Sequence, residues 1–201
     1  MQTTKISNGG TNSKHKIIFE GAELAGKSYL MSQIYNNIEP KYNSGGHILD
    51  GCHWFNLDVG VYGTSFGQKA LSRYMELFED LKDTNLMAEK FHLTETVYQK
   101  LYHNYDFDYS DIEARLKKLN AKIILVTFDK SEELIKHRLE DRLKLYPHYK
   151  SIMQTPAAYI RQQELYEDLI SKSKLDHLVV NASKLPNPSL VDKILEFLGE
   201  K

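Results

Sequence analysis

Residues 17–28 constrain this chain more than any other segment: Ile-Ile-Phe-Glu-Gly-Ala-Glu-Leu-Ala-Gly-Lys-Ser. The second part has the spacing Gly-x-x-x-x-Gly-Lys-Ser of the phosphate-binding P-loop. It lies between a predicted strand and a predicted helix, which is the context that this motif requires. Because glycine adopts backbone angles that a side chain forbids, Gly21 and Gly26 let the turn direct consecutive N–H groups at phosphate oxygens. The alternative is an ordinary glycine-containing turn between a strand and a helix.

The chemistry of a P-loop assigns roles to its residues. We expect Lys27 to reach the outer phosphates of ATP, and we expect the Ser28 hydroxyl to ligate Mg²⁺. The predicted cofactors are therefore ATP and Mg²⁺. The predicted nucleotide-binding residues are Gly21, Ala22, Glu23, Leu24, Ala25, Gly26, Lys27, Ser28 and Tyr29.

The composition of the 201 residues is that of an ordinary globular domain, with 41% hydrophobic and 26% charged residues. The net charge is -1, so no large basic field indicates a duplex nucleic-acid partner. No apolar run approaches the length of a membrane span. The single cysteine, Cys52, fits a reducing compartment, and we expect a cytoplasmic protein. We expect residues 1–14 to be a flexible tail without a targeting core, and residues 15–201 to form one domain.

Strand and helix patterns alternate along the chain. Apolar or β-branched runs predict strands at residues 16–20, 47–50, 85–90, 121–127 and 177–180. Amphipathic patterns predict helices at residues 27–37, 66–82, 93–102, 110–119, 132–146, 156–173 and 189–198. This alternation predicts an α/β fold in which a five-stranded parallel sheet carries helices on both faces. Ligands then bind beyond the carboxyl ends of the strands.

Local signals mark several boundaries. Residues 51–66 are rich in glycine and aromatic residues and have no clean period, which indicates a functional loop. Ser110 and Glu113 have the spacing of a capping box that opens a helix. Ser131 and Thr155 are predicted N-caps of the two helices that follow them.

Four stretches resemble the thymidylate kinase group of P-loop nucleotide kinases: residues 19–28, 62–68, 88–99, and 134–144 together with 161–166. The resemblance implies a three-layer P-loop nucleotide kinase fold with a helical lid at about residues 138–155. Five positions depart from the pattern of the group. Leu24 and Tyr62 each replace a glycine, and Gln68 replaces an acid. Leu71 replaces an arginine, and so does Lys90. The last change keeps the charge but loses a two-pronged grip on phosphate.

The resemblance also implies residues for the acceptor. The acidic position taken by Glu23 can hold the sugar hydroxyl of a monophosphate substrate in the group. The plain alternative for Glu23 is a loop carboxylate near a helix N-terminus. Tyr98 and Gln99 match positions that touch the acceptor base, and Arg73 is the candidate for the missing arginine. The predicted substrate-binding residues are Glu23, Phe66, Arg73, Lys90, Tyr98 and Gln99.

The residues predicted to act in catalysis are Lys27, Glu89, Arg138 and Arg142. Glu89 is expected to order Mg²⁺-bound water or to accept a hydrogen bond from the substrate, and the predicted metal residues are Ser28 and Glu89. The alternative for Glu89 is a strand-end salt bridge with a nearby lysine. Arg138 and Arg142 are four residues apart and share one side of a helix, where they can neutralise the transferred phosphoryl group. Their alternative is a solvated, charged helix face.

Three classes of function stay open on these grounds. The first is ATP-dependent transfer of a phosphoryl group to a (deoxy)nucleoside monophosphate, with dTMP as the expected acceptor. Members of the thymidylate kinase group are often dimers, so a homodimer is an option. The second class is a P-loop kinase of a hydroxyl acceptor, either a deoxynucleoside or a polynucleotide end. The third is a nucleotide-binding ATPase module. A GTPase switch is disfavoured, because no Asn-Lys-x-Asp motif follows a late strand.

Overall fold

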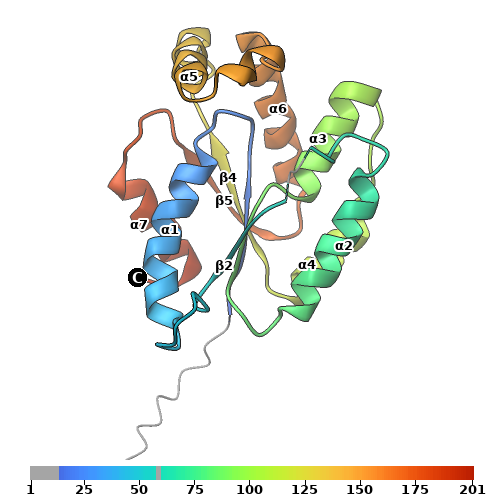
Figure 1. Cartoon of the computed structure of the whole chain (residues 1–201). Helices are drawn as coiled ribbons and strands as arrows, with labels where there is room; N and C mark the ends of the chain where they lie inside the picture. Colours follow the sequence, from blue (N-terminus) through green and yellow to red (C-terminus); the bar gives the residue numbers. More distant parts are fainter. Residues whose placement is uncertain (1–13, 58–59) are drawn as a thin grey trace, which may run out of the picture.

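The structure, a computed structural model, describes residues 14–57 and 60–201. Within them, five parallel strands form one sheet in the order β2-β3-β1-β4-β5. The strands are β1 (Lys16–Glu20), β2 (His53–Asn56), β3 (Leu86–Glu89), β4 (Lys122–Thr127) and β5 (Asp176–Asn181). The helices are α1 (Lys27–Tyr42), α2 (Gly67–Asp80), α3 (His92–His103), α4 (Ser110–Lys118), α5 (Glu132–Leu145), the 3₁₀ helix η1 (Pro147–Ser151), α6 (Pro156–Lys172) and α7 (Pro188–Leu198). The predicted five-stranded parallel sheet with helices on both faces is confirmed (Figure 1).

The direction of each crossover decides which face of the sheet its helices cover, because parallel strands are joined by right-handed connections. The chain moves from β1 toward one edge through α1. It moves the opposite way through α2, through α3 and α4, and through α5 and α6. Accordingly, α1 and α7 lie on one face, and α2, α3, α4 and α6 lie on the other (Figure 1). The direction reverses at β1, so a crevice opens beyond the carboxyl end of this strand.

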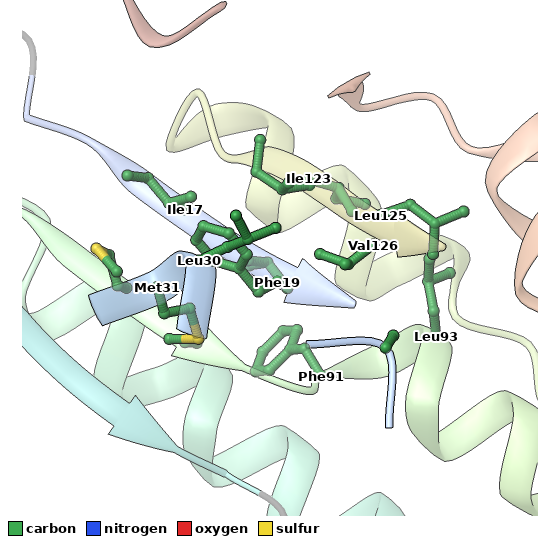
Figure 2. Packing of buried hydrophobic residues seen from close by; sticks show 14 of the residues in the cluster. Ile17, Phe19, Leu30, Met31, Phe91, Leu93, Ile123, Leu125 and Val126 are labelled. Carbon is green, nitrogen blue, oxygen red and sulfur yellow. The ribbon is translucent and has the colours of Figure 1, made fainter. Parts of the chain in front are cut away.

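The core is centred on β1, every residue of which is buried. Leu30 and Met31 of α1 lie beside Phe19 of β1 on one face (Figure 2). On the other face, Phe78 of α2 stacks on Phe91, with ring centroids 5.0 Å apart. Burying a side chain of this size contributes about 1.5–3 kcal/mol. The core therefore holds β1, and with it the start of the P-loop, firmly in place.

Most predicted boundaries hold to within a few residues, and two predicted caps are confirmed. The Ser131 hydroxyl accepts a hydrogen bond from the N–H of Leu134 at 3.3 Å. The Thr155 hydroxyl accepts one from the N–H of Ala158 at 3.3 Å. These caps fix where α5 and α6 begin, and both helices border the crevice.

The predicted strand at residues 47–50 is wrong, because β2 lies further along the chain, inside the stretch predicted to be a functional loop. Ile48 and Leu49 are each 70% exposed, so their apolar side chains do not join the core. The N–H of His53 instead donates to the carbonyl oxygen of Asn85 at 2.9 Å and starts the pairing with β3. Long-range pairing thus outweighs local apolar character here.

One helix boundary also differs from expectation. Helix α1 continues through Pro40 to Tyr42, whereas the sequence predicts an end near residue 37. Proline removes a single N–H, and the last turn still closes, since the N–H of Asn43 donates to the carbonyl oxygen of Glu39 at 2.9 Å.

The capping box predicted at Ser110 is wrong. Ser110 is the first helical residue, and its N–H donates to the Asp108 carboxylate at 2.9 Å. The Glu113 carboxylate turns away from the helix end and accepts hydrogen bonds from the Ser173 hydroxyl at 2.5 Å and the Lys174 N–H at 3.0 Å. Packing of α4 against the segment before β5 therefore decides the direction of this side chain.

Two predictions fall partly outside the described residues. The tail predicted at residues 1–14 lies outside them except for Lys14, and residues 58 and 59 of the predicted functional loop also lie outside. None of the helices in the described part of the chain combines the length and the apolar character needed to cross a bilayer.

Candidate active site

The P-loop connects β1 to α1 and takes the left-handed backbone conformation at three residues. The φ angles are 137° at Gly21, 65° at Leu24 and 91° at Gly26. A Cβ at Gly21 would lie 2.2 Å from the carbonyl oxygen of Val126, so no side chain fits there. Leu24 adopts the left-handed conformation despite its side chain, at a cost of about 1–2 kcal/mol. Backbone strain of this kind clusters at functional sites.

Lys27 is the first residue of α1 and is only 4% exposed. Its ammonium group donates to the carbonyl oxygens of Gly21 and Ala22, each at 2.8 Å. Burial lowers the pKa of Lys27 to about 8; the nearby charge of Lys90 contributes to this shift, while Glu89 acts in the opposite direction. The loop thus encloses a cation that an anionic ligand would stabilise.

The Ser28 hydroxyl donates to the carboxylate of Glu89 at 2.9 Å. Glu89 ends β3 and pairs with Phe19 of the neighbouring β1, which brings it to the edge where the P-loop begins. A hydroxyl and a carboxylate are oxygen ligands of the kind that Mg²⁺ prefers, and this ion keeps several of its waters when bound. The pair therefore fits the predicted metal site.

Lys90 follows β3 directly, and its backbone also has the left-handed conformation, with a φ of 65°. Its ammonium group donates to the Tyr98 hydroxyl at 3.3 Å. Glu20, the fully buried last residue of β1, accepts hydrogen bonds from the N–H groups of Phe91 and Leu93, each at 3.0 Å. Burial raises the pKa of Glu20. The carboxyl group caps α3 and so fixes the turn that presents Lys90.

Glu23 is tied to three elements at once. One carboxylate oxygen accepts a hydrogen bond from the Tyr98 hydroxyl of α3 at 3.1 Å, and the other accepts one from the Tyr149 hydroxyl of η1. The backbone N–H of Glu23 donates to the side-chain carbonyl of Gln162 in α6 at 2.8 Å. These contacts hold the middle of the P-loop against α3, α6 and η1.

The two predicted arginines of α5 are half-buried, so a fully solvated helix face does not describe them. Arg138 donates to the carbonyl oxygens of Leu24 at 2.7 Å and Ala182 at 2.5 Å. Burial lowers the pKa of Arg138. Arg142 lies over the rings of Tyr146 and Tyr149, 5.7 and 5.2 Å from their centroids. Arg138 thus joins the P-loop to the segment after β5, while Arg142 rests on the segment after α5.

The P-loop, the ends of β2 and β3, α5 and η1 enclose a cavity of about 990 Å³. Most of the predicted site residues line it: Glu23, Leu24, Ala25, Gly26, Lys27, Ser28, Tyr29, Glu89, Lys90, Arg138 and Arg142. Gly21 and Ala22 are buried in the first turn of the loop. Residues that the sequence analysis did not single out also line the cavity, among them Asn56, Tyr149 and the segment 183–185.

Four of the predicted substrate-binding residues do not line this cavity. Tyr98 lies behind it, where its hydroxyl contacts Glu23 and Lys90. The Phe66 side chain is 65% exposed just before α2. Arg73 pairs with Glu76 at 2.7 Å on an exposed face of the same helix. Gln99 donates to the carbonyl oxygen of Thr64 at 3.3 Å and lines a separate hollow of about 370 Å³. The acceptor roles of these four residues stay predictions.

Two residues with direct contacts to the P-loop were missed by the sequence analysis. Gln162 lies in the stretch 161–166, which carried part of the resemblance, so its position had a signal although its contact did not. Tyr149 lies in the predicted lid, where no spacing rule distinguishes one tyrosine from another. Both contacts join residues far apart in the sequence, and only the folded chain shows them.

No protein-family model and no curated protein sequence matches this chain. Several solved structures are similar to it. The YorR protein from Bacillus subtilis, in a crystal structure in complex with phosphorylated GDP, has a TM-score of 0.62 and 20% identity, covering 91% of this chain and 95% of that chain. Shikimate kinase from Bacteroides thetaiotaomicron has a TM-score of 0.52 and 13% identity, covering 92% of this chain and 98% of that chain.

At sequence identities of 20% and 13%, the similarity shows the fold alone. The sheet, the helices on both of its faces and the P-loop between β1 and α1 agree with these neighbours. The chain therefore has the fold of P-loop kinases.

Proposed function

We propose that this protein is a P-loop kinase that transfers the γ-phosphoryl group of ATP to a (deoxy)nucleoside monophosphate such as dTMP. One observation carries the proposal: a single cavity contains both the P-loop lysine, Lys27, and two residues predicted to bind the acceptor, Glu23 and Lys90. The volume of this cavity, about 990 Å³, is at the upper end of the range for small-molecule sites. This volume supports the proposal that a donor and an acceptor bind there together.

In the proposed reaction, an acceptor oxygen forms a bond to the γ-phosphorus of ATP, the bond from that phosphorus to the bridging oxygen breaks, and ADP leaves. The transition state is loose, so positioning and charge neutralisation dominate catalysis. Lys27 exchanges its two carbonyl acceptors for phosphate oxygens, which favour its charged form and raise its pKa from about 8. Ser28 and Glu89 are the residues that would hold Mg²⁺, which would neutralise charge on the outer phosphates.

A phosphate on the acceptor is supported by the arrangement of positive charge. Lys90 is close enough to Lys27 that its charge lowers the pKa of Lys27, and both residues line the cavity. Two neighbouring cations in a partly buried site repel each other unless anions separate them. A donor triphosphate and an acceptor monophosphate would supply these anions. The YorR protein has a similar fold, and its crystal structure is in complex with phosphorylated GDP. This supports a nucleotide as the class of ligand for the present protein.

A hydroxyl acceptor is the second candidate, and Glu89 is the observation that favours it. Its carboxylate lines the cavity beside Ser28 and is placed to accept a proton from a hydroxyl group. A kinase of nucleosides would need such a base, whereas a kinase of monophosphates would not.

The test is a panel of nucleosides, nucleoside monophosphates and 5′-hydroxyl oligonucleotides, each incubated with ATP and Mg²⁺ and analysed by phosphate-resolved chromatography. The proposal expects acceptor-dependent ADP release with at least one monophosphate. Phosphorylation of nucleosides alone would replace it with the second candidate. ADP release that no acceptor stimulates would leave only an ATPase module.

The Lys27→Ala variant links the reaction to the cavity. We expect turnover to fall by about 10²-fold or more, because a preorganised cation at the transferred group is lost. Lys117→Ala is the matched control, since Lys117 is an exposed lysine of α4. Wild-type turnover in Lys27→Ala would place the reaction elsewhere.

A further inference from the structure

We propose that Tyr149 is a positioning residue that fastens the segment 146–155 to the P-loop and holds Arg142 at the edge of the cavity. The catalytic consequence of this inference rests on the proposed kinase function, whereas the fastening itself does not. In Figure 1, α5 and the segment after it lie at the end of the sheet where the P-loop lies. Two residues of the segment, Tyr149 and Ile152, line the cavity.

The anchor is a hydrogen bond from the Tyr149 hydroxyl to the carboxylate of Glu23. Tyr149 is only 7% exposed, although most of the residues around it on the segment are exposed. The carboxylate is held from its other side by Tyr98, and the backbone of Glu23 is held by Gln162. The segment after α5 is thus attached to a part of the P-loop that is itself fixed.

The same side chain supports Arg142. The guanidinium group lies 5.2 Å from the centroid of the Tyr149 ring and 5.7 Å from that of Tyr146. Tyr149 therefore makes two contacts with different atoms, its hydroxyl on the P-loop and its ring under the arginine. Because both contacts belong to one side chain, Tyr149 connects the P-loop to Arg142.

A second hydroxyl reinforces the anchor. The hydroxyl groups of Tyr149 and Tyr159 are 3.4 Å apart, and the Tyr159 hydroxyl accepts a hydrogen bond from the N–H of Gln154 at 3.0 Å. Burial and the Glu23 carboxylate raise the pKa of Tyr149, so its hydroxyl stays protonated and remains a donor. The segment is consequently held near both of its ends.

A kinase must exclude water from the γ-phosphoryl group. When water enters, its oxygen bonds to the γ-phosphorus, the bond to the bridging oxygen breaks, a proton goes to solvent, and phosphate is released instead of phosphorylated acceptor. A loosened segment 146–155 would admit water and let Arg142 move away. Loss of the anchor should therefore change how ATP is divided between transfer and hydrolysis, which a merely structural role would not do.

The test compares Tyr149→Phe with Tyr146→Phe by amide hydrogen exchange on the whole protein. Tyr149→Phe keeps the ring under Arg142 and removes the anchor. We expect exchange in residues 146–155 to become about tenfold faster or more, the factor that corresponds to losing a hydrogen bond to a charged acceptor. Tyr146→Phe removes a hydroxyl from the other ring, which is 49% exposed, and should leave exchange in the segment within about twofold of the wild type. Equal exchange in wild type and Tyr149→Phe would overturn the inference.

The second measurement is the ratio of phosphate released to acceptor phosphorylated at saturating ATP and acceptor. We expect this ratio to rise at least fivefold in Tyr149→Phe, with the dissociation constant of a non-hydrolysable ATP analogue changed less than about threefold. Faster exchange with an unchanged ratio would limit Tyr149 to a structural role and overturn its part in the reaction. If the wild type transfers no phosphoryl group, the proposed function fails, and the exchange comparison still decides whether the anchor exists.

Discussion

Gly21→Ala tests how tightly the start of the P-loop is enclosed. Gly21 has a φ of 137°, and a Cβ there would lie 2.2 Å from the carbonyl oxygen of Val126 in β4. The left-handed conformation costs an L-residue about 1–2 kcal/mol. The overlap adds about 1–3 kcal/mol, since the obstacle is backbone in the central sheet and cannot rotate away. We therefore expect a loss of about 2–5 kcal/mol in the free energy of unfolding.

Gly45→Ala is the matched control. Gly45 also has a positive φ, 80°, but no atom lies within 4 Å of the place that an added Cβ would take. Only the conformational cost of about 1–2 kcal/mol applies to it. Urea unfolding followed by circular dichroism measures both variants, and titration with a fluorescent ATP analogue reports on the loop. For a chain of this size, the loss in Gly21→Ala corresponds to a fall in Tm of about 4–20 °C.

The comparison of the two variants separates the effect of the overlap with β4 from the effect of the backbone conformation. Gly21→Ala should be less stable than Gly45→Ala by about 1–3 kcal/mol and should bind the ATP analogue at least tenfold more weakly. If both variants unfold at the same urea concentration and bind the analogue as the wild type does, β4 does not enclose the loop as described, and the account of the P-loop is refuted.

Three further predictions follow from other contacts. Ser28→Ala should raise the Mg²⁺ concentration needed for half-maximal turnover by about tenfold, because one of the two protein side chains predicted to hold the ion loses its oxygen. Titration of activity with Mg²⁺ checks this, and an unchanged midpoint would contradict it. Arg138→Ala should lower the free energy of unfolding by about 1.5–3 kcal/mol, since the carbonyl oxygens of Leu24 and Ala182 lose a charged donor. Urea unfolding measures this loss, and a midpoint equal to that of the wild type would contradict the prediction. Burial alone would raise the pKa of Glu113, but its hydrogen bonds lower it to about 2. Because this folded-state pKa is below the unfolded value, the stabilisation is present above about pH 4.5 and is lost as pH falls toward 2. Glu113→Gln should therefore be less stable than the wild type at pH 7, and the gap should narrow between pH 4.5 and pH 3; a constant gap would show that the carboxylate is not the cause.

The P-loop could be predicted from sequence because its determinants are local. The spacing of Gly21, Gly26 and Lys27 encodes backbone angles and a charge within one turn, and the apolar run before it encodes a buried strand. The alternation of strand and helix patterns likewise predicts the parallel sheet, since each crossover needs a helix to return the chain. The N-caps Ser131 and Thr155 were predictable for the same reason: each contacts an N–H group three residues away.

Tertiary structure alone decided the features that depend on residues distant in the chain. Strand β2 is set by the pairing of His53 with β3, so local apolar residues at 47–50 misled the prediction. Glu113 turned to Ser173 rather than to its own helix end for a similar reason. In each case a long-range contact competed with a local preference of about 1 kcal/mol or less, and the long-range contact prevailed.

The sequence by itself determined that this chain has a phosphate-binding turn between a buried strand and a helix in a parallel α/β fold, because glycine angles, apolar periodicity and charge act over a few residues. Only the folded chain decided which side chains face that turn. The hydroxyl of Tyr149 meets Glu23 across 126 positions of sequence, and Arg138 meets Leu24 across 114. No local preference specifies such contacts, because they arise from the packing of whole helices around the end of the sheet.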